Sequence, residues 1–329
     1  MATLTHDSAN RTRTGLLFAL ASATSFGLSG PLARGLMDAG WSAAAVVAAR
    51  VLLAGIVLLP LALRQLRGNW NLVRANAKLI VAYGLIAVAG TQLAYFNAVA
   101  HMTVGAALLI EFTAPIAVVG WLWVRYRQRP GAATVTGAML GVAGLLLVLE
   151  VMSGLSVQAV GVAWALASMV GAATYFVLSA HGTDLPGTVL AAGGLLIGGV
   201  ILLLAGAVGI VPLRAATDPV AFADFTTPWW VPIALIGVVT AAIAYVTGIA
   251  ATRRLGSRLA SFVALTEVLA ALVFAWALLG EAPRPIQLLG GALILVGVVI
   301  VRLGEPDTVA VGDPEAQTVA DDGAAAPQP

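Results

Sequence analysis

The chain has 329 residues, of which 60% are hydrophobic and only 10% charged, far below the about 25% charged residues of an average soluble protein. It has no cysteine, which excludes disulfides, thiol catalysis and cysteine-ligated metal sites. The net charge of +2 is small and the three histidines, His6, His101 and His181, are scattered, so we expect no nucleic-acid partner, metal or cofactor.

Ten apolar stretches, each about as long as a bilayer is thick, take up most of the chain. About 20 apolar residues, rising about 1.5 Å each, cross a hydrocarbon core of about 30 Å. None of the stretches alternates like a barrel strand, and inside lipid only helices and closed barrels satisfy their backbone groups. We therefore predict an all-α integral membrane protein with ten transmembrane helices, over roughly 15–35, 44–63, 79–99, 103–124, 134–152, 159–179, 188–211, 229–251, 259–279 and 286–303.

The first stretch begins like a signal peptide. Arg11 and Arg13 precede an apolar run that contains Ala21-Ser22-Ala23, a sequence typical of a cleavage site. The run continues to Pro31, however, so we predict an uncleaved first helix that follows an N-terminal segment, 1–14.

The positive charges predict the orientation. Alternate connections, starting with the N-terminus, carry thirteen basic residues, and the other side carries only Arg34, Arg214 and Arg284. This bias places both termini in the cytoplasm of a multi-pass protein of the cell (inner) membrane. The acidic, alanine- and proline-rich residues 304–329 then form a disordered cytoplasmic tail. The thirteen are Arg11, Arg13, Arg64, Arg67, Arg74, Lys78, Arg125, Arg127, Arg129, Arg253, Arg254, Arg258 and Arg302.

The chain contains an internal repeat. Residues 111–148 align with 264–301 without gaps, so that Gly137 meets Gly290 and Gly144 meets Gly297. Ala19-Leu20-Ala21-Ser22 also matches Ala165-Leu166-Ala167-Ser168. Each half, 15–152 and 159–303, thus holds five helices. Because five is odd, the second half enters the membrane from the opposite face and is inverted relative to the first. Inverted 5+5 repeats are typical of secondary transporters, with a site near the midplane.

Several segments resemble a known family. Leu265-Thr266-Glu267-Val268, Leu278-Leu279-Gly280-Glu281 and Pro285–Gly290 are similar to the second half of EamA-type transporters of the drug/metabolite transporter superfamily. Leu109–Pro115 resembles the corresponding segment of bacterial threonine/homoserine exporters. The resemblance covers about 15–303 and implies ten helices in two halves, cytoplasmic termini and export of small metabolites.

Three charged residues lie well inside the predicted helices, where a charge costs about 2.5–3.5 kcal/mol on insertion scales. Arg50 and Glu111 share a depth of about 10–12 Å from the outer surface, and Glu267 lies near the middle. Glu111 and Glu267 are candidates for binding a substrate ammonium or a coupling proton. The alternatives are a structural ion pair between Arg50 and Glu111, or an Arg50 side chain that extends outward.

Polar and aromatic side chains fall on helical faces beside these charges. A cavity for a small zwitterion needs aromatic walls and a few hydrogen-bonding groups. We therefore predict that substrate-binding residues include Gln92, Tyr95, Trp164, Ser168 and Tyr175, together with Glu111 and Arg50. Small and hydroxylated residues also pack transmembrane helices closely, which is the structural alternative. Pro115 removes the backbone hydrogen bond to the Glu111 carbonyl and predicts a kink there.

Glycine ridges predict helix packing. Gly137, Gly141 and Gly144 lie on one face, and Gly194 and Gly198 form a second ridge. Gly290 and Gly297 repeat part of the first ridge. Because 134–152 and 286–303 end their halves, an exposed ridge there would serve a homodimer.

These patterns predict a secondary transporter rather than an enzyme. We expect alternating access and export of a small amino-acid-like metabolite, with lipid, substrate and coupling protons as partners besides the homodimer. The alternatives are export of another amphipathic metabolite or drug, and a non-transporting scaffold. Gly27-Leu28-Ser29-Gly30 with His101 also has the form of an intramembrane serine protease, which would need a Ser–His pair. A Walker-type sequence for ATP hydrolysis is absent.

The two glutamates are expected to differ in role. Glu267 has no basic residue at a helical neighbour spacing, whereas Arg50 shares the depth of Glu111. We therefore expect Glu267 to bind and release the coupling proton and Glu111 to anchor the substrate.

Overall fold

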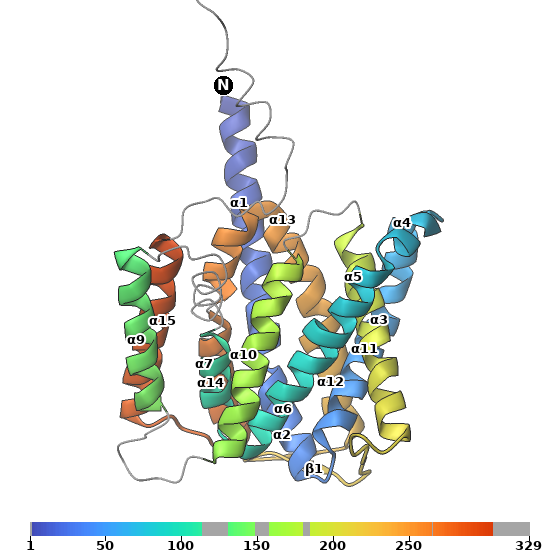
Figure 1. The fold of residues 1–329 in the computed structure, drawn as a ribbon, viewed down its shortest axis with the longest axis vertical. Helices are drawn as coiled ribbons and strands as arrows, with labels where there is room; N and C mark the ends of the chain where they lie inside the picture. Colours follow the sequence, from blue (N-terminus) through green and yellow to red (C-terminus); the bar gives the residue numbers. More distant parts are fainter. Residues whose placement is uncertain (1, 114–130, 149–157, 180–184, 265, 305–329) are drawn as a thin grey trace, which may run out of the picture.

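The computed structural model describes residues 2–113, 131–148, 158–179, 185–264 and 266–304, which are mostly helical (Figure 1). In the first half the elements are α1 (Ala2–Gly27), α2 (Ser29–Asp38), α3 (Ala43–Leu66), α4 (Trp70–Ala75), α5 (Ala77–Ala82), the π-helical η1 (Tyr83–Gly90), α6 (Thr91–His101), α7 (Val104–Glu111) and α9 (Ala132–Val148). In the second half they are α10 (Ala159–Ser179), α11 (Gly187–Ala207), β1 (Val220–Ala221), β2 (Thr226–Thr227), α12 (Trp230–Gly237), the π-helical η3 (Val238–Ile243), α13 (Ala244–Ala264), α14 (Thr266–Leu279) and α15 (Pro285–Gly304).

Five helical spans are long and apolar enough, by length and composition, to cross a membrane: Arg13–Asp38, Ala43–Leu66, Ala77–His101, Gly187–Ala207 and Trp230–Gly248. Four further apolar helices are shorter: Val135–Gly144, Ala159–Thr174, Thr266–Leu279 and Pro285–Ile300. Of the predicted helix over 103–124, only the part up to Thr113 lies among the described residues. The helical membrane architecture is therefore confirmed, but ten full-length spans are not.

Two predicted boundaries were wrong, and one connection contains a strand pair that was not predicted. The first membrane helix extends to Asp38 but is interrupted at Leu28, because Pro31 has no N–H to bond the carbonyl of Gly27. The predicted connection after 251 is helical, since α13 continues to Ala264 without a proline to stop it. The long connection between α11 and α12 contains the antiparallel hairpin β1–β2, in which Val220 pairs with Thr227. Its β-branched residues favour this short strand pair.

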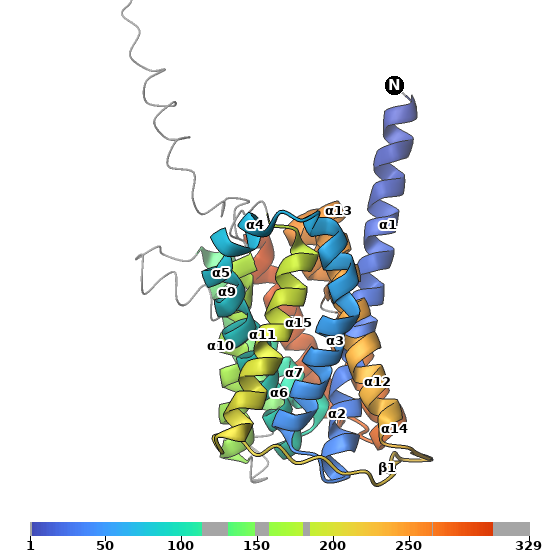
Figure 2. The ribbon, with the colours of Figure 1, turned by 90° about the vertical axis from the view of Figure 1, so that its right-hand side faces the viewer.

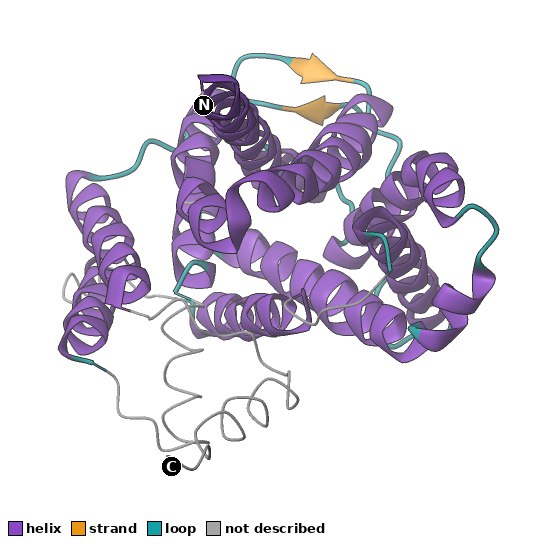
Figure 3. Cartoon of the chain, turned by 90° about the horizontal axis from the view of Figure 1, so that it is seen from above, coloured by secondary structure: helices purple, strands orange, loops and turns teal. Residues whose placement is uncertain are grey.

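The bundle has two distinct ends. The end from which α1 projects carries the last turn of α3, the helix α4 and the start of α5 (Figure 2). These segments contain four basic residues, Arg64, Arg67, Arg74 and Lys78. We call this the basic end. The opposite end carries the β1–β2 hairpin at the rim of the helical bundle, and we call it the hairpin end (Figure 3).

Helices α9 and α15 pack against each other along their glycine ridges, to one side of the bundle (Figure 1). A Cβ added to Gly297 would lie 2.5 Å from the carbonyl oxygen of Gly137 and 2.8 Å from the nitrogen of Gly141. A Cβ added to Gly144 would meet the carbonyl oxygen of Gly290. The ridge is thus occupied within one chain, which corrects the expectation that it is exposed for a homodimer.

The second glycine ridge packs on a π-helical segment. A Cβ added to Gly84 in η1 would lie 2.7 Å from the carbonyl oxygen of Gly194 and 3.2 Å from the nitrogen of Gly198, both on α11. The prediction of a helix-packing surface is confirmed here. The second half has a π-helical segment of its own, η3, near the middle of the span formed by α12 and the start of α13. Such segments leave backbone carbonyls open to other partners and often lie at functional sites.

Candidate functional site

Arg50 lies inside the bundle, about 10 Å from the hairpin end, with a side chain that is 2% exposed. Its Nη1 donates to Oε1 of Gln92 at the start of α6, and its Nη2 donates to the carbonyl oxygen of Thr240 in η3 at 2.8 Å. The guanidinium carbon lies 5.5 Å from the ring centre of Phe96 and 6.0 Å from that of Phe26. Arg50 therefore joins the two halves of the chain and satisfies a backbone carbonyl that lipid could not.

Glu111 is held by a different partner. The hydroxyl of Ser168 on α10 is buried and donates to Oε2 of Glu111 at 2.7 Å. Among the described residues, no ion pair joins Arg50 to a carboxylate. The structural ion pair considered for Arg50 and Glu111 is not formed, because Arg50 reaches Gln92 and η3 instead. Nor does Arg50 extend outward to solvent.

Glu267 completes the group of buried charges. It is the second residue of α14, and Gly27 of α1 packs against its backbone, since a Cβ added to Gly27 would lie 3.0 Å from the Glu267 carbonyl oxygen. Among the described residues, none hydrogen-bonds the Glu267 carboxylate. It interacts electrostatically with both Glu111 and Arg50. One cation and two carboxyl groups from the two halves thus lie within electrostatic reach of one another.

Aromatic rings surround these charges. Tyr95 is 8% exposed, and its ring centre lies 5.7 Å from that of Phe96. Tyr245, also 8% exposed, packs edge-on against Phe26 with ring centres 5.4 Å apart. Tyr95 and Tyr245 both interact electrostatically with Arg50. Sequence reasoning identified Tyr95 but missed Tyr245 and Phe26, because an aromatic residue inside an apolar stretch gives no separate signal.

The interrupted first helix adds a buried hydroxyl. Ser29 begins α2 directly after the break, is 3% exposed, and its Oγ has no hydrogen-bond partner among the described residues. His101 is exposed at the end of α6, where Nδ1 lies 2.7 Å from the carbonyl oxygen of Asn97. The described structure therefore forms no Ser29–His101 pair, which removes the geometric basis for the protease alternative. Broken helices are instead a common feature of transporter sites.

The comparisons with known proteins agree with this architecture. The model of the EamA-like transporter family matches residues 13–150 and 159–303, one match to each half of the chain. The chain belongs to the EamA-like transporter family. This makes it a membrane protein of the drug/metabolite transporter superfamily, whose members carry small molecules. A search of curated proteins finds no match.

A solved structure supports the fold alone. The structure, titled only as the crystal structure of a protein, covers 89% of this EamA-like chain and 98% of its own, with 19% identity and a TM-score of 0.59. At that identity it says nothing about substrate.

The EamA-like chain does not bring every predicted site residue together. Gln92, Tyr95, Glu111, Ser168 and Arg50 meet as described above. Trp164 lies one turn before Ser168 on α10, and 37% of it is exposed. Its predicted role stays a prediction. The side chain of Tyr175 and all of Pro115 lie outside the described residues.

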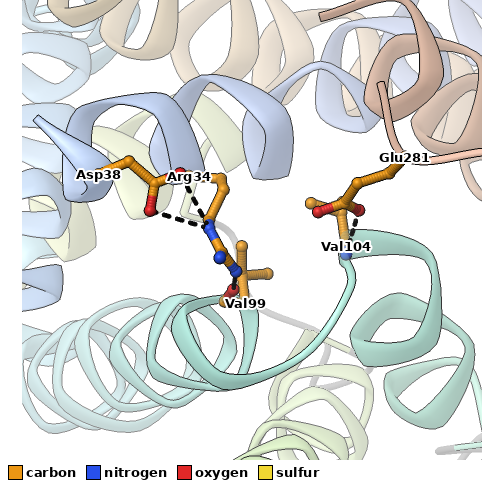
Figure 4. A network of polar contacts seen from close by, with 5 residues as sticks. All are labelled: Arg34, Asp38, Val99, Val104 and Glu281. Atoms are coloured by element: carbon orange, nitrogen blue, oxygen red, sulfur yellow. Dashed lines mark hydrogen bonds and ion pairs between the residues drawn. The ribbon is translucent and has the colours of Figure 1, made fainter. Parts of the chain in front are cut away.

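Polar contacts join several elements at the hairpin end of this EamA-like protein, around the connection between α6 and α7 (Figure 4). Arg34 of α2 forms an ion pair with Asp38, with Nε 3.1 Å from Oδ1, and its Nη1 donates to the carbonyl oxygen of Val99 at 2.7 Å. The backbone N–H of Val104, at the start of α7, donates to Oε2 of Glu281 at 3.1 Å. A cation thus lies at the C-terminus of α6 and a carboxylate at the N-terminus of α7, as the helix dipoles favour. Burial raises the pKa of Glu281, an effect that the Val104 N–H and the charge of Arg34 partly offset.

Proposed function

We propose that this EamA-like protein is a secondary transporter that exports a small amino-acid-like metabolite across the cell membrane by alternating access. The observation that carries the proposal is the buried group of Arg50, Glu111 and Glu267, which is drawn from both halves of an inverted repeat. Charges inside a membrane span are costly, and transporters place their sites where the repeats meet. The carboxyl groups suit a substrate ammonium, and Tyr95 and Tyr245 supply aromatic walls.

The closed hairpin end supports alternating access. A Cβ added to Gly30 of α2 would lie 2.6 Å from the Tyr95 hydroxyl and 2.5 Å from Cγ1 of Val104. Gly105 of α7 packs equally closely against Leu272 of α14. With the basic end cytoplasmic, as the positive-inside bias predicts, the closed end faces outward. The site would then exchange with the cytoplasm until these contacts separate.

Counterflow in proteoliposomes tests the proposal. Radiolabelled threonine, homoserine and other amino acids would be exchanged against the same unlabelled compounds, with Glu111→Gln as the test variant. The matched control is Asp218→Asn, which neutralises an exposed carboxylate in the connection before β1. We expect wild type and control to exchange at least one amino acid and Glu111→Gln to lose most of that exchange. If wild type exchanges no amino acid, the amino-acid proposal fails and another amphipathic metabolite or drug becomes the candidate substrate. Unchanged exchange in Glu111→Gln would contradict the assigned site.

We further propose that Glu267 carries a coupling proton while Glu111 anchors the substrate. The support is the contrast in their surroundings, since Glu111 accepts a hydrogen bond from Ser168 and Glu267 has no described hydrogen-bond partner. Glu267→Gln should flatten the pH dependence of transport and leave substrate binding measurable, whereas Glu111→Gln should weaken binding. An unchanged pH profile in Glu267→Gln would instead favour facilitated diffusion or assign the proton to Glu111.

A further inference from the structure

A groove separates α7 and α14 from α15. Its volume is about 320 Å³, and most of the residues that line it are apolar. Leu109 of α7 and Val268 and Ala275 of α14 form the inner wall, and each is at most 3% exposed. Ala292 on α15 belongs to the facing wall. The groove is distinct from the buried charges, although Leu109 lies only two residues before Glu111.

The groove opens toward the surrounding bilayer. Leu269 and Leu288 line it on α14 and α15, and they are 55% and 51% exposed. Trp276, on the same outer part of α14, is 62% exposed, and tryptophan commonly lies near the membrane interface. A groove that opens sideways into hydrocarbon is filled from the lipid phase, because apolar cavities stay dry and empty space loses packing contacts.

The groove has one polar end. Thr103, Glu281 and Gln287 line it beside the connection between α14 and α15, at the hairpin end. Along α15 the lining runs from Gln287 to Leu295, a length of about 12 Å at 1.5 Å per residue. A polar mouth followed by a long apolar channel matches a lipid, with the headgroup at the mouth and a chain inside.

The charges at the mouth select among headgroups. Glu281 provides a carboxylate, and Arg284 is exposed three residues later on the same connection. A headgroup with a primary ammonium next to a phosphate complements both charges. An anionic headgroup without an ammonium places a like charge beside Glu281, whose Oε2 already accepts from the Val104 N–H. We propose that this groove binds one acyl chain of a phospholipid whose ammonium-bearing headgroup contacts Glu281.

Native mass spectrometry of the full chain in mild detergent tests this site. The protein would be reconstituted with equal amounts of phosphatidylethanolamine and phosphatidylglycerol of identical chains, then extracted. We expect wild type to retain one phosphatidylethanolamine with a preference of about tenfold over phosphatidylglycerol, the size expected of a charge-assisted contact. Glu281→Gln should keep a lipid but lose the preference.

A matched pair of variants tests the location. Ala292→Trp fills the groove, while Leu289→Trp adds the same side chain to the exposed face of the same helix, where Leu289 is 57% exposed and does not line the groove. Loss of the retained lipid in Ala292→Trp alone supports the proposal. Equal retention in both variants, or no headgroup preference in wild type, would overturn it.

A second pair of variants, with smaller side chains, tests the location if Ala292→Trp does not fold. The chain has no cysteine, so Ala292→Cys and Leu289→Cys each give a single position for a fluorophore. Brominated phosphatidylethanolamine should quench the first label more strongly than brominated phosphatidylglycerol and quench the second without preference. Equal quenching by both lipids at both positions would contradict the site.

Discussion

Ser22 and Ser168 make matching contacts in the two halves of the chain. Ser22 Oγ donates to the carbonyl oxygen of Ala244 at 2.8 Å, and Ser168 Oγ lies 3.4 Å from the carbonyl oxygen of Thr91. Ala244 and Thr91 are each the first residue after a π-helical segment. The two serines belong to the same repeated sequence, Ala-Leu-Ala-Ser. Each half therefore places a serine at the point where its π-helical segment returns to α-helix.

The two serines differ in one respect, which gives the first prediction. Ser168 also donates to Glu111, whereas the described hydrogen bond of Ser22 goes to backbone only. Ser168→Ala should weaken substrate binding by about tenfold to a hundredfold, the cost of a lost hydrogen bond to a charged group. Ser22→Ala should lower thermal stability but leave binding unchanged. Binding curves and unfolding temperatures in the same detergent separate the two effects, and equal loss of binding in both variants would contradict the distinction.

Arg50 gives the second prediction, which concerns stability. Arg50→Gln leaves Glu111 and Glu267 without their nearby cation, and removing one member of a buried charge group costs about 3–5 kcal/mol. Arg50→Lys keeps the charge but loses the planar fork that reaches Gln92 and Thr240 together, so its loss should be smaller. Reversible unfolding in mixed detergent micelles measures both. An Arg50→Gln variant as stable as wild type would show that Arg50 is dispensable for holding the halves together.

The membrane architecture could be predicted because the thickness of the hydrocarbon core sets the length of a spanning helix, and the length of each apolar stretch is visible in the sequence. It also located Arg50, Glu111 and Glu267, since charges inside apolar stretches are conspicuous. It did not predict the partners of Arg50, because the Thr240 carbonyl is available only through the π-helical geometry of η3. The periodicity of side chains in the sequence does not reveal a π-helical segment. Nor did it predict the capping of α7 by Glu281, which joins residues 177 positions apart.

Glu281 gives the third prediction, which concerns pH. Its pKa is raised where it is buried at the closed hairpin end, chiefly by desolvation, and should return to the ordinary range once that end opens to water. The closed form therefore binds the proton more tightly. The extra stability of the closed form is fully present below the ordinary carboxyl pKa. It is lost as the pH rises through the raised pKa of Glu281. Raising the pH should thus favour opening, and Glu281→Gln, which stays neutral, should remove this dependence.

Reaction with a membrane-impermeant thiol reagent measures that opening. Leu108 on α7 is 3% exposed behind the closed end, and Leu108→Cys introduces the single cysteine of the chain. Arg34 and Asp38 keep their ion pair beside Glu281 in both backgrounds, and His101 at the end of α6 is unchanged in both. A difference between the two pH profiles therefore belongs to Glu281. Identical profiles with and without Glu281→Gln would assign the pH dependence to another group.

Gly30 gives the last prediction, which tests whether closure of the hairpin end is part of transport. A Cβ at this position would lie 2.6 Å from the Tyr95 hydroxyl and 2.5 Å from Cγ1 of Val104. Because both of these side chains are buried, we expect a larger side chain to push α2 away from α6 and α7. Gly30→Val should therefore hold the hairpin end open. We expect transport to fall by at least tenfold, while Leu108→Cys in the same background becomes reactive from outside. Gly68→Ala is the matched control, because Gly68 has no atoms near its added Cβ, although its positive φ of 81° makes that change mildly destabilising. Retained transport together with an unreactive cysteine in Gly30→Val would mean that α2 shifts to accept the side chain and that closure does not depend on this contact.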